Sequence, residues 1–224
     1  MPEVLGWDDT ALVVTWLAAE QPSRRAAERF GQDLARLHQA GAAGFGAPWR
    51  GFIASLFLPN DGEVPGRAPR ADPPPWLDWY VAHRVLPYLR RSVDAGVMTT
   101  SDAAVVDSSL ARAAALAGPP EPPSRIHGDC WSGNLLWADG RGWLIDPAAH
   151  GGHRETDLAM LALFGAPYLD RILAAYQDAA TLADGWQVRV PLHQLHPLLV
   201  HVCLFGAAYR QPVLDAARAL LAAS

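Results

Sequence analysis

One hairpin signal, set within an otherwise helical pattern, constrains this fold more than any other feature of the sequence. Two short apolar runs, 134–137 and 142–145, flank a four-residue turn at 138–141. The Asp-Gly pair in that turn, between β-like segments, is a strong signal for a tight hairpin. Elsewhere, apolar positions recur at helical spacing. The helices predicted from this spacing cover 23–40, 76–95, 101–116, 155–164, 167–180, 187–205 and 211–223.

The fold class that we predict is α+β and mainly helical, with a second small hairpin at the N-terminus. Residues 3–18 indicate two short strands around a turn at 7–10, because β-branched and apolar residues flank a cluster of turn formers. Ser23 and Ser101 are the expected caps of the first and third helices, since a serine side chain can accept a backbone N–H at a helix start.

A long surface loop is expected over residues 41–75, which carry many of the glycines and prolines and show no sustained period. Gly44-Phe45-Gly46 lies inside this segment. It lacks the context of a phosphate-binding loop, because no predicted strand precedes it and no clear helix follows it. We therefore expect a flexible loop there.

The length of 224 residues and an apolar content of 50% are those of one globular domain with a sizeable core. No apolar run reaches the roughly 18 residues of a spanning helix, and the N-terminus lacks the pattern of a signal peptide, so we expect a cytoplasmic protein without a membrane partner. Cys130 and Cys203 are too few for a disulfide framework. The net charge of −5 gives no electrostatic case for nucleic acid. The oligomeric state is not indicated.

All 18 basic residues are arginine, so the chain contains no lysine. A mechanism that needs a Schiff base, a Walker A lysine or the phosphate-clamping lysine of a kinase must take it from another chain or do without it. The codon usage of a GC-rich bacterial genome would also produce a chain rich in arginine and alanine. The two explanations are compatible.

The candidate site lies around the central hairpin. Asp129 and Asn134 are five residues apart on the loop that leads into its first strand, and Asp146 follows its second strand. One carboxylate can accept a proton from a hydroxyl, while an amide oxygen and a second carboxylate are hard ligands for magnesium. Phosphoryl transfer needs these parts, because its transition state is handled chiefly by positioning and metal neutralisation. The spacing reproduces the catalytic loop and metal-binding aspartate of protein kinases.

Simpler interpretations exist for each of these residues. An isolated Asp or Asn in a turn is usually a cap, but the joint pattern favours catalysis. Trp131 could equally be a core residue, because tryptophan is mostly buried in any protein. His193, His196 and His201 invite a metal-site interpretation, yet their spacing is not that of HExxH and no acid is placed among them, which favours packing or pocket lining.

Four segments resemble the fructosamine kinase (ketosamine 3-kinase) family, relatives of the aminoglycoside phosphotransferases. They are 127–134 (HGDCWSGN), 144–153 (LIDPAAHGGH), 154–165 (RETDLAMLALFG) and 192–209 (LHQLHPLLVHVCLFGAAY). The resemblance extends from residue 2 to the C-terminus. Cys130 replaces a usual aliphatic residue, which a small apolar side chain should tolerate, and His153 stands where the family often has an acid. The resemblance implies a protein-kinase-like C-lobe over 19–224, preceded over 1–18 by the hinge and the last N-lobe strands.

The resemblance also implies roles for the residues of the candidate site. Asp129 matches the catalytic base of the family, and Asn134 and Asp146 match its magnesium ligands. Trp131 matches a residue that lines the sugar end of the pocket.

Further residues match supporting positions. His127 would orient the catalytic loop by hydrogen bonding, and Asp157 would accept backbone N–H groups and brace the site. The strand at 13–18 resembles the kinase hinge. Backbone groups at Thr15, Trp16 and Leu17 would there pair with the adenine edge of ATP.

The implied activity is ATP- and magnesium-dependent phosphorylation of a sugar hydroxyl on a ketosamine (fructosamine or ribulosamine), as in protein deglycation. Two alternatives stay open: another small-molecule kinase of the aminoglycoside phosphotransferase type, and a non-catalytic binding lobe. Kinases carry a glycine-rich loop, a lysine and a glutamate before the hinge, whereas here the hinge segment begins close to Met1. We therefore expect a truncated gene model or partial chain with little activity alone.

Overall fold

The computed structural model describes residues 1–48 and 75–223, and helices dominate this part of the chain. The strands are β1 (Val4–Trp7), β2 (Leu12–Val14), β3 (Ser124–Ile126), β4 (Leu135–Ala138), β5 (Arg141–Leu144) and β6 (His150–Gly152). The helices are α1 (Arg24–Gln39), α2 (Trp76–Tyr80), α3 (Leu86–Asp94), α4 (Thr100–Leu116), α5 (Glu155–Phe164), α6 (Leu169–Ala179), α7 (Trp186–Phe205) and α8 (Arg210–Ala222). Three single turns complete them: η1 (Val81–Val85), η2 (Ser132–Asn134) and η3 (Gly206–Tyr209).

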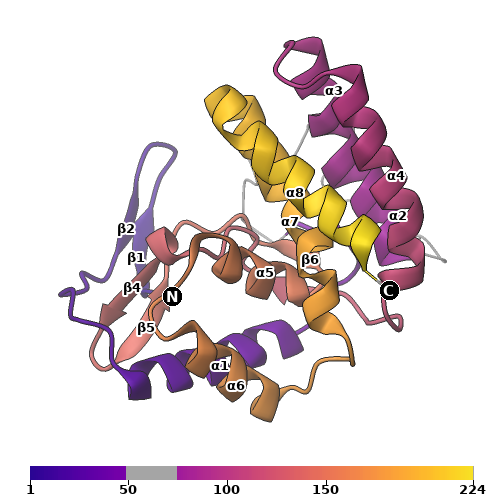
Figure 1. Cartoon of the computed structure of the whole chain (residues 1–224). Helices are drawn as coiled ribbons and strands as arrows, with labels where there is room; N and C mark the ends of the chain where they lie inside the picture. Colours follow the sequence, from indigo (N-terminus) through magenta and orange to yellow (C-terminus); the bar gives the residue numbers. More distant parts are fainter. Residues whose placement is uncertain (49–74, 224) are drawn as a thin grey trace.

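Two apolar clusters hold the helices together. In one, α1 and α6 lie side by side and pack with β4, β5 and α5 around Phe30, Leu34 and Tyr176. In the other, α7 packs against α3 and α8, with Leu195 and Leu199 fully buried (Figure 1). Helix α5 also packs against α7, so it joins the two clusters. The segment between β3 and α5 carries the candidate site, and its strands β4 and β5 belong to the first cluster through Leu135, Trp137 and Leu144.

The central hairpin is confirmed. Strands β4 and β5 pair antiparallel from Leu135 opposite Leu144 to Ala138 opposite Arg141. Asp139 and Gly140 both have positive φ, 53° and 66°, which is the backbone of the two-residue turn that suits the strand twist. The N-terminal hairpin β1–β2 is confirmed as well. A third pair, β3 with β6, was not predicted, because two three-residue strands far apart in sequence leave no readable period.

The helix caps agree with expectation in one case and not in the other. Ser23 caps α1 by accepting the Ala26 N–H at 3.2 Å. Ser101 is not a cap, because the third predicted helix begins one residue earlier and Thr99 caps it. Thr99 and Asp102 form a reciprocal capping box, which satisfies two backbone donors where a serine cap would satisfy one.

The helix predicted over 76–95 is present but contains one wide turn. Pro87 has no N–H to donate to the His83 carbonyl, so a normal helical hydrogen bond is missing there. The Leu86 N–H bonds instead to Val81, five residues back, and η1 results. The Arg84 guanidinium donates to the His83 carbonyl at 3.4 Å, which gives that oxygen another partner.

Most of the loop predicted over 41–75 lies outside the described residues. In its described beginning, the Gly46 N–H bonds to the Gly151 carbonyl at 2.8 Å, and the Phe45 ring stacks on Trp79 with ring centroids 6.1 Å apart. The stretch Gly44-Phe45-Gly46 thus packs against β6 and α2.

The stretch Trp186–Ala222 is long and apolar enough, by length and composition alone, to cross a membrane. This differs from the expectation that no run of the sequence is long and apolar enough. The stretch comprises α7, η3 and α8. A buried core helix passes the same test, and the interior of α7 has this character: Leu192, Leu195 and Leu199 are fully buried against neighbouring helices.

Candidate active site

The candidate catalytic loop comprises residues 127–134. It begins where β3 ends and leads through η2 into β4. Gly128 has a φ of 81°, and a Cβ at this position would lie 2.2 Å from the Ala148 carbonyl oxygen. Only glycine fits this backbone and this approach. The loop therefore runs in direct contact with the segment that follows Asp146.

Asp129 and Asn134 are brought together as predicted. The Asn134 amide nitrogen donates to the Asp129 carboxylate at 2.8 Å and to its carbonyl oxygen at 3.0 Å. Burial raises the pKa of the half-buried Asp129 carboxyl, against an opposing effect of the Asn134 hydrogen bond. A carboxylate with a raised pKa is the better proton acceptor.

Asp146 lies beside the same loop because its neighbour Ile145 forms two hydrogen bonds with residues of that loop. The Ile145 N–H donates to the Asn134 carbonyl at 3.0 Å, and the His127 ring Nε2 donates to the Ile145 carbonyl at 2.9 Å. Asp146 itself is exposed, has a φ of 48°, and makes no hydrogen bond through its carboxylate to any other described residue. Its carboxylate is therefore available for a ligand.

This donor set fits magnesium. Asn134 directs its amide nitrogen to Asp129, which leaves its amide oxygen for another partner. That oxygen and the Asp146 carboxylate are the hard oxygen donors that magnesium prefers, and magnesium commonly takes only one or two protein ligands beside phosphate and water.

Asp157 holds the backbone at the start of the catalytic loop. Its carboxylate accepts the N–H of His127 at 2.7 Å and of Gly128 at 2.9 Å, and it contacts the His38 ring Nε2 at 3.1 Å. Burial alone would raise the pKa of Asp157, but hydrogen bonds from His38 and His127 outweigh it and the pKa is lowered. His38 was not predicted as part of the site. Its signal is a histidine in phase with Phe30 and Leu34 on the apolar face of α1.

We expect Asp157→Ala to lower the free energy of unfolding by about 3 kcal/mol and to abolish activity, because it leaves two backbone N–H groups and the His38 ring without an acceptor inside the protein. Urea unfolding followed by circular dichroism measures the change. Asp215→Ala is the matched control, since Asp215 is exposed and, among the residues that the structure describes, pairs only with Arg218 and Gln211. Equal midpoints for the two variants would contradict the role of Asp157.

Trp131 is not a core residue, since 37% of it is exposed. Its ring lies over Gly133, where a Cβ would come within 2.2 Å of the indole, and meets Phe164 edge-on at 5.7 Å between centroids. The ring centroids of Phe164 and His201 are 5.1 Å apart, and those of His201 and Tyr209 are 4.7 Å apart. Trp131, Phe164, His201 and Tyr209 thus form an aromatic row. Trp131 lies two residues after Asp129 in the sequence, so the row begins beside this carboxylate.

Packing or pocket lining was predicted for His201, but the aromatic row to which it belongs was not predicted. Its signal was present, because His201, Phe205 and Tyr209 follow one another at intervals of four residues across α7 and η3. Phe205 is 62% exposed, so the row ends at the surface.

The predicted hinge residues, Thr15, Trp16 and Leu17, follow directly after β2. The Thr15 N–H donates to the Glu3 carbonyl at 2.9 Å, and the Thr15 hydroxyl donates to the same oxygen at 3.3 Å. Trp16 is 90% exposed. The backbones of Trp16 and Leu17 form no hydrogen bond with another described residue, and no described contact joins them to the catalytic loop.

A second polar cluster is buried behind the site. The expectation that no acid lies among the histidines was wrong for His193, whose Nε2 is 3.3 Å from Glu155, with His153 close by. These three side chains offer metal-binding atoms. Arg189, however, occupies both Glu155 oxygens at 2.6 and 2.9 Å, and its charge opposes a metal cation. Trp76 stacks on His193 with ring centroids 4.5 Å apart, so packing accounts for the cluster.

Burial of neutral histidines should make the protein sensitive to acid. Burial lowers the pKa of His150 and of His153 to about 3, and also lowers those of His193 and His196. In the unfolded chain these groups take up protons below a pH of about 6.5, whereas the folded protein does not, so stability is lost as the pH falls below that value. We expect about 1 kcal/mol per histidine between pH 7 and pH 5.5.

Urea unfolding at several pH values measures this loss. His196→Gln should reduce the slope of stability against pH, while His83→Gln, at a partly exposed position, should leave it unchanged. Stability that does not vary between pH 7 and pH 5.5 would contradict the prediction.

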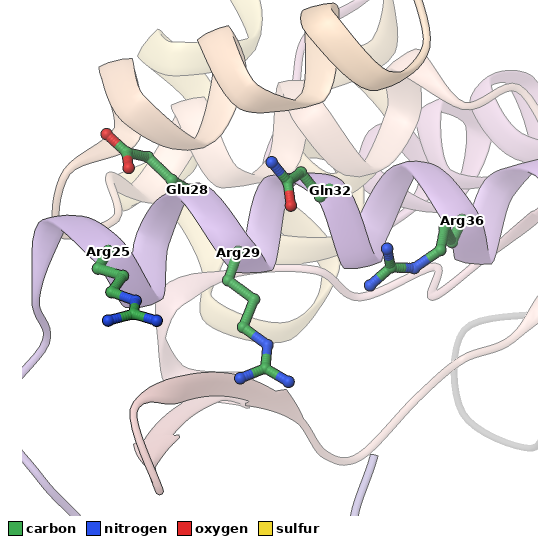
Figure 2. Close-up of a pocket in the computed structure, with 5 residues that line it drawn as sticks. All are labelled: Arg25, Glu28, Arg29, Gln32 and Arg36. Carbon is green, nitrogen blue, oxygen red and sulfur yellow. The ribbon is translucent and has the colours of Figure 1, made fainter.

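A surface hollow of about 340 Å³ lies on the outer side of α1, away from the catalytic loop. Figure 2 shows the five side chains that line it: Arg25, Glu28, Arg29, Gln32 and Arg36. Glu28 lies 3.7 Å from Arg171, and Arg36 pairs with Asp33, but α1 carries four arginines against two acids, so its charge is net positive. This face has the character of a solvated helix surface.

The fold is protein-kinase-like. The family model described as fructosamine kinase matches residues 2–223, and the chain belongs to the fructosamine kinase family. The predicted resemblance is confirmed.

Individual relatives agree with this assignment. A Synechocystis protein named as a ketoamine kinase is 34% identical over 206 residues, which are 89% of this chain and 64% of the relative. A solved structure described as a fructosamine-3-kinase from Thermobifida fusca is 55% identical, with a TM-score of 0.89 over 99% of this chain and 74% of that one. A choline/ethanolamine kinase family protein from Mesorhizobium loti, 19% identical with a TM-score of 0.59 over 99% of this chain and 74% of that one, shares the fold. The predicted fold class is confirmed, and the chain spans just under two thirds of the Synechocystis relative.

Proposed function

We propose that this chain is the catalytic lobe of an ATP-dependent kinase that phosphorylates a sugar hydroxyl of a ketosamine. The observation that carries the proposal is the joint placement of Asp129, Asn134 and Asp146 around the start of the central hairpin, by the hydrogen bonds of Asn134 and Ile145. Membership of the fructosamine kinase family supports the substrate class.

In this proposal Asp129 accepts the proton of the sugar hydroxyl as the hydroxyl oxygen bonds to the γ-phosphorus of ATP. The bond between that phosphorus and the bridging oxygen breaks, and ADP leaves with the electron pair. The raised pKa of Asp129 suits it to receive the proton. Magnesium, held by Asn134 and Asp146, would neutralise phosphate charge when bound.

The aromatic row supports a sugar derivative as substrate. Trp131 presents a partly exposed indole next to Asp129, and a sugar offers apolar C–H faces that pack on such rings. His201 donates from Nδ1 to the Pro197 carbonyl at 2.7 Å, so its Nε2 remains an acceptor for a substrate hydroxyl. On the nucleotide side, the open backbone groups of Trp16 and Leu17 would pair with adenine.

The test uses a fusion protein in which this chain follows the N-terminal segment of the Thermobifida fusca relative, because the family resemblance places the lysine, glutamate and glycine-rich loop before the hinge. With magnesium and ATP, we expect a phosphate ester on fructoselysine, detected by ³¹P NMR and mass spectrometry. Phosphorylation of kanamycin in its place would favour the aminoglycoside alternative, and turnover of neither compound would favour a binding lobe.

The pH dependence of the same reaction reports on Asp129. Because burial raises the pKa of this carboxyl, kcat/KM should increase with pH through a midpoint above about 3.9, the ordinary value for aspartate. Initial rates between pH 4 and pH 8, on protein checked for folding at each pH, measure it. A rate that is constant across this range would count against Asp129 as the base.

A further inference from the structure

A buried polar path leads from α6 to the catalytic loop. The Tyr176 hydroxyl on α6 lies 2.8 Å from His38 Nδ1 on α1, and His38 Nε2 lies 3.1 Å from the Asp157 carboxylate on α5. Tyr176 and Asp157 are fully buried, and 2% of His38 is exposed. Since Asp157 holds the His127 and Gly128 N–H groups, three helices meet at the backbone just before Asp129.

The chemistry of these groups determines where each proton lies. Asp157 is ionised, because its pKa is lowered, and an ionised carboxylate can only accept. A neutral His38 must therefore donate from Nε2, since the other neutral tautomer would bring two lone pairs face to face. Its Nδ1 is then an acceptor that needs a donor, and burial keeps Tyr176 a phenol by raising its pKa.

We propose that Tyr176 is a positioning residue for the catalytic loop: its hydroxyl fixes the tautomer of His38, and His38 thereby holds Asp157 against the backbone that carries Asp129. Tyr176 touches neither substrate nor nucleotide in this proposal. Its effect on rate rests on the proposed kinase function, whereas its effect on His38 and on the loop does not.

Tyr176→Phe removes only the hydroxyl. Tyr80→Phe is the matched control, because Tyr80 is another fully buried tyrosine whose hydroxyl bonds to the Leu192 and His193 carbonyls and the His196 N–H. Ring ¹⁵N NMR reports the tautomer of His38, with its signals assigned by their loss in His38→Ala. Hydrogen exchange reports how firmly the His127 and Gly128 amides are held.

In the unaltered chain we expect the Nε2–H tautomer of His38. In Tyr176→Phe we expect a mixture of tautomers, roughly tenfold faster exchange of the two loop amides, and a kcat of the fusion protein lowered about tenfold with KM nearly unchanged. Tyr80→Phe should change none of these. In a His38→Ala background, Tyr176→Phe should have no further effect on the loop amides, because the imidazole that transmits the effect is gone.

The proposal is overturned by an Nδ1–H tautomer of His38 in the unaltered chain, a measurement that needs no variant to fold. Unchanged loop amides in Tyr176→Phe, or equal changes in Tyr80→Phe, would also overturn it. If the fusion protein lacks kinase activity while the NMR results follow expectation, the proposed function fails and the link from Tyr176 to the loop stands.

Discussion

Asp129→Asn in the fusion protein is expected to lower kcat for ketosamine phosphorylation by about 10³-fold, within the range that loss of a general base produces. The amide cannot accept the hydroxyl proton, but its oxygen can still receive the hydrogen bond from Asn134, so the loop should keep its shape. Steady-state kinetics measure the rate. Thermal unfolding checks that the midpoint is unchanged.

Asp139→Asn is the matched control for this substitution. Asp139 lies in the turn of the central hairpin with a φ of 53°, a conformation that asparagine adopts as readily as aspartate, and it is exposed. Its activity should equal that of the unaltered protein. Turnover by Asp129→Asn within tenfold of that level would refute the assignment of the base.

The second large effect concerns the 224-residue chain by itself, which contains no lysine. One preorganised electrostatic group is typically worth about 10² to 10³ in rate, and the kinase mechanism uses a lysine, its glutamate partner and a loop over the phosphates. We expect ketosamine phosphorylation by the chain alone to be at least about 10³-fold slower than by the fusion protein.

The comparison is made at equal protein concentration with saturating magnesium and ATP. Asp129→Asn in each protein provides the background rate. A rate for the chain alone that is close to that of the fusion protein, and that Asp129→Asn removes, would show that the arginines and backbone of this lobe are sufficient.

Elements with a strong local signal could be predicted from the sequence. The Asp-Gly turn, the apolar spacing of α1 and the helices beyond Glu155 each depend on neighbours within a few residues. The wide turn at η1 was missed although its cause is local: Pro87 lies in the interior of the helix predicted over 76–95, where a proline disturbs the regular hydrogen bonds. The pairing of β3 with β6 depends on contacts that no local pattern records.

The residues of the candidate site also differ in whether the sequence could predict them. Asp129, Asn134 and Asp146 were identified by their spacing around one hairpin. His38 and Tyr176 were not, because each reaches Asp157 or its partner from a different helix and resembles an ordinary core residue in its own segment. Glu155 and Arg189 pair over 34 positions, beyond the reach of spacing arguments.

The link between His38, Tyr176 and Asp157 also has a consequence for the order of folding. Its hydrogen bonds join residues 119 and 138 positions apart in the chain. Contacts of such long range form only after the loops between them have closed, which is slow compared with helix formation. During synthesis from the N-terminus, the backbone just before Asp129 is fixed only after α5 and α6 have been made and have packed against α1. The candidate site is therefore completed late, after most of the chain has been made.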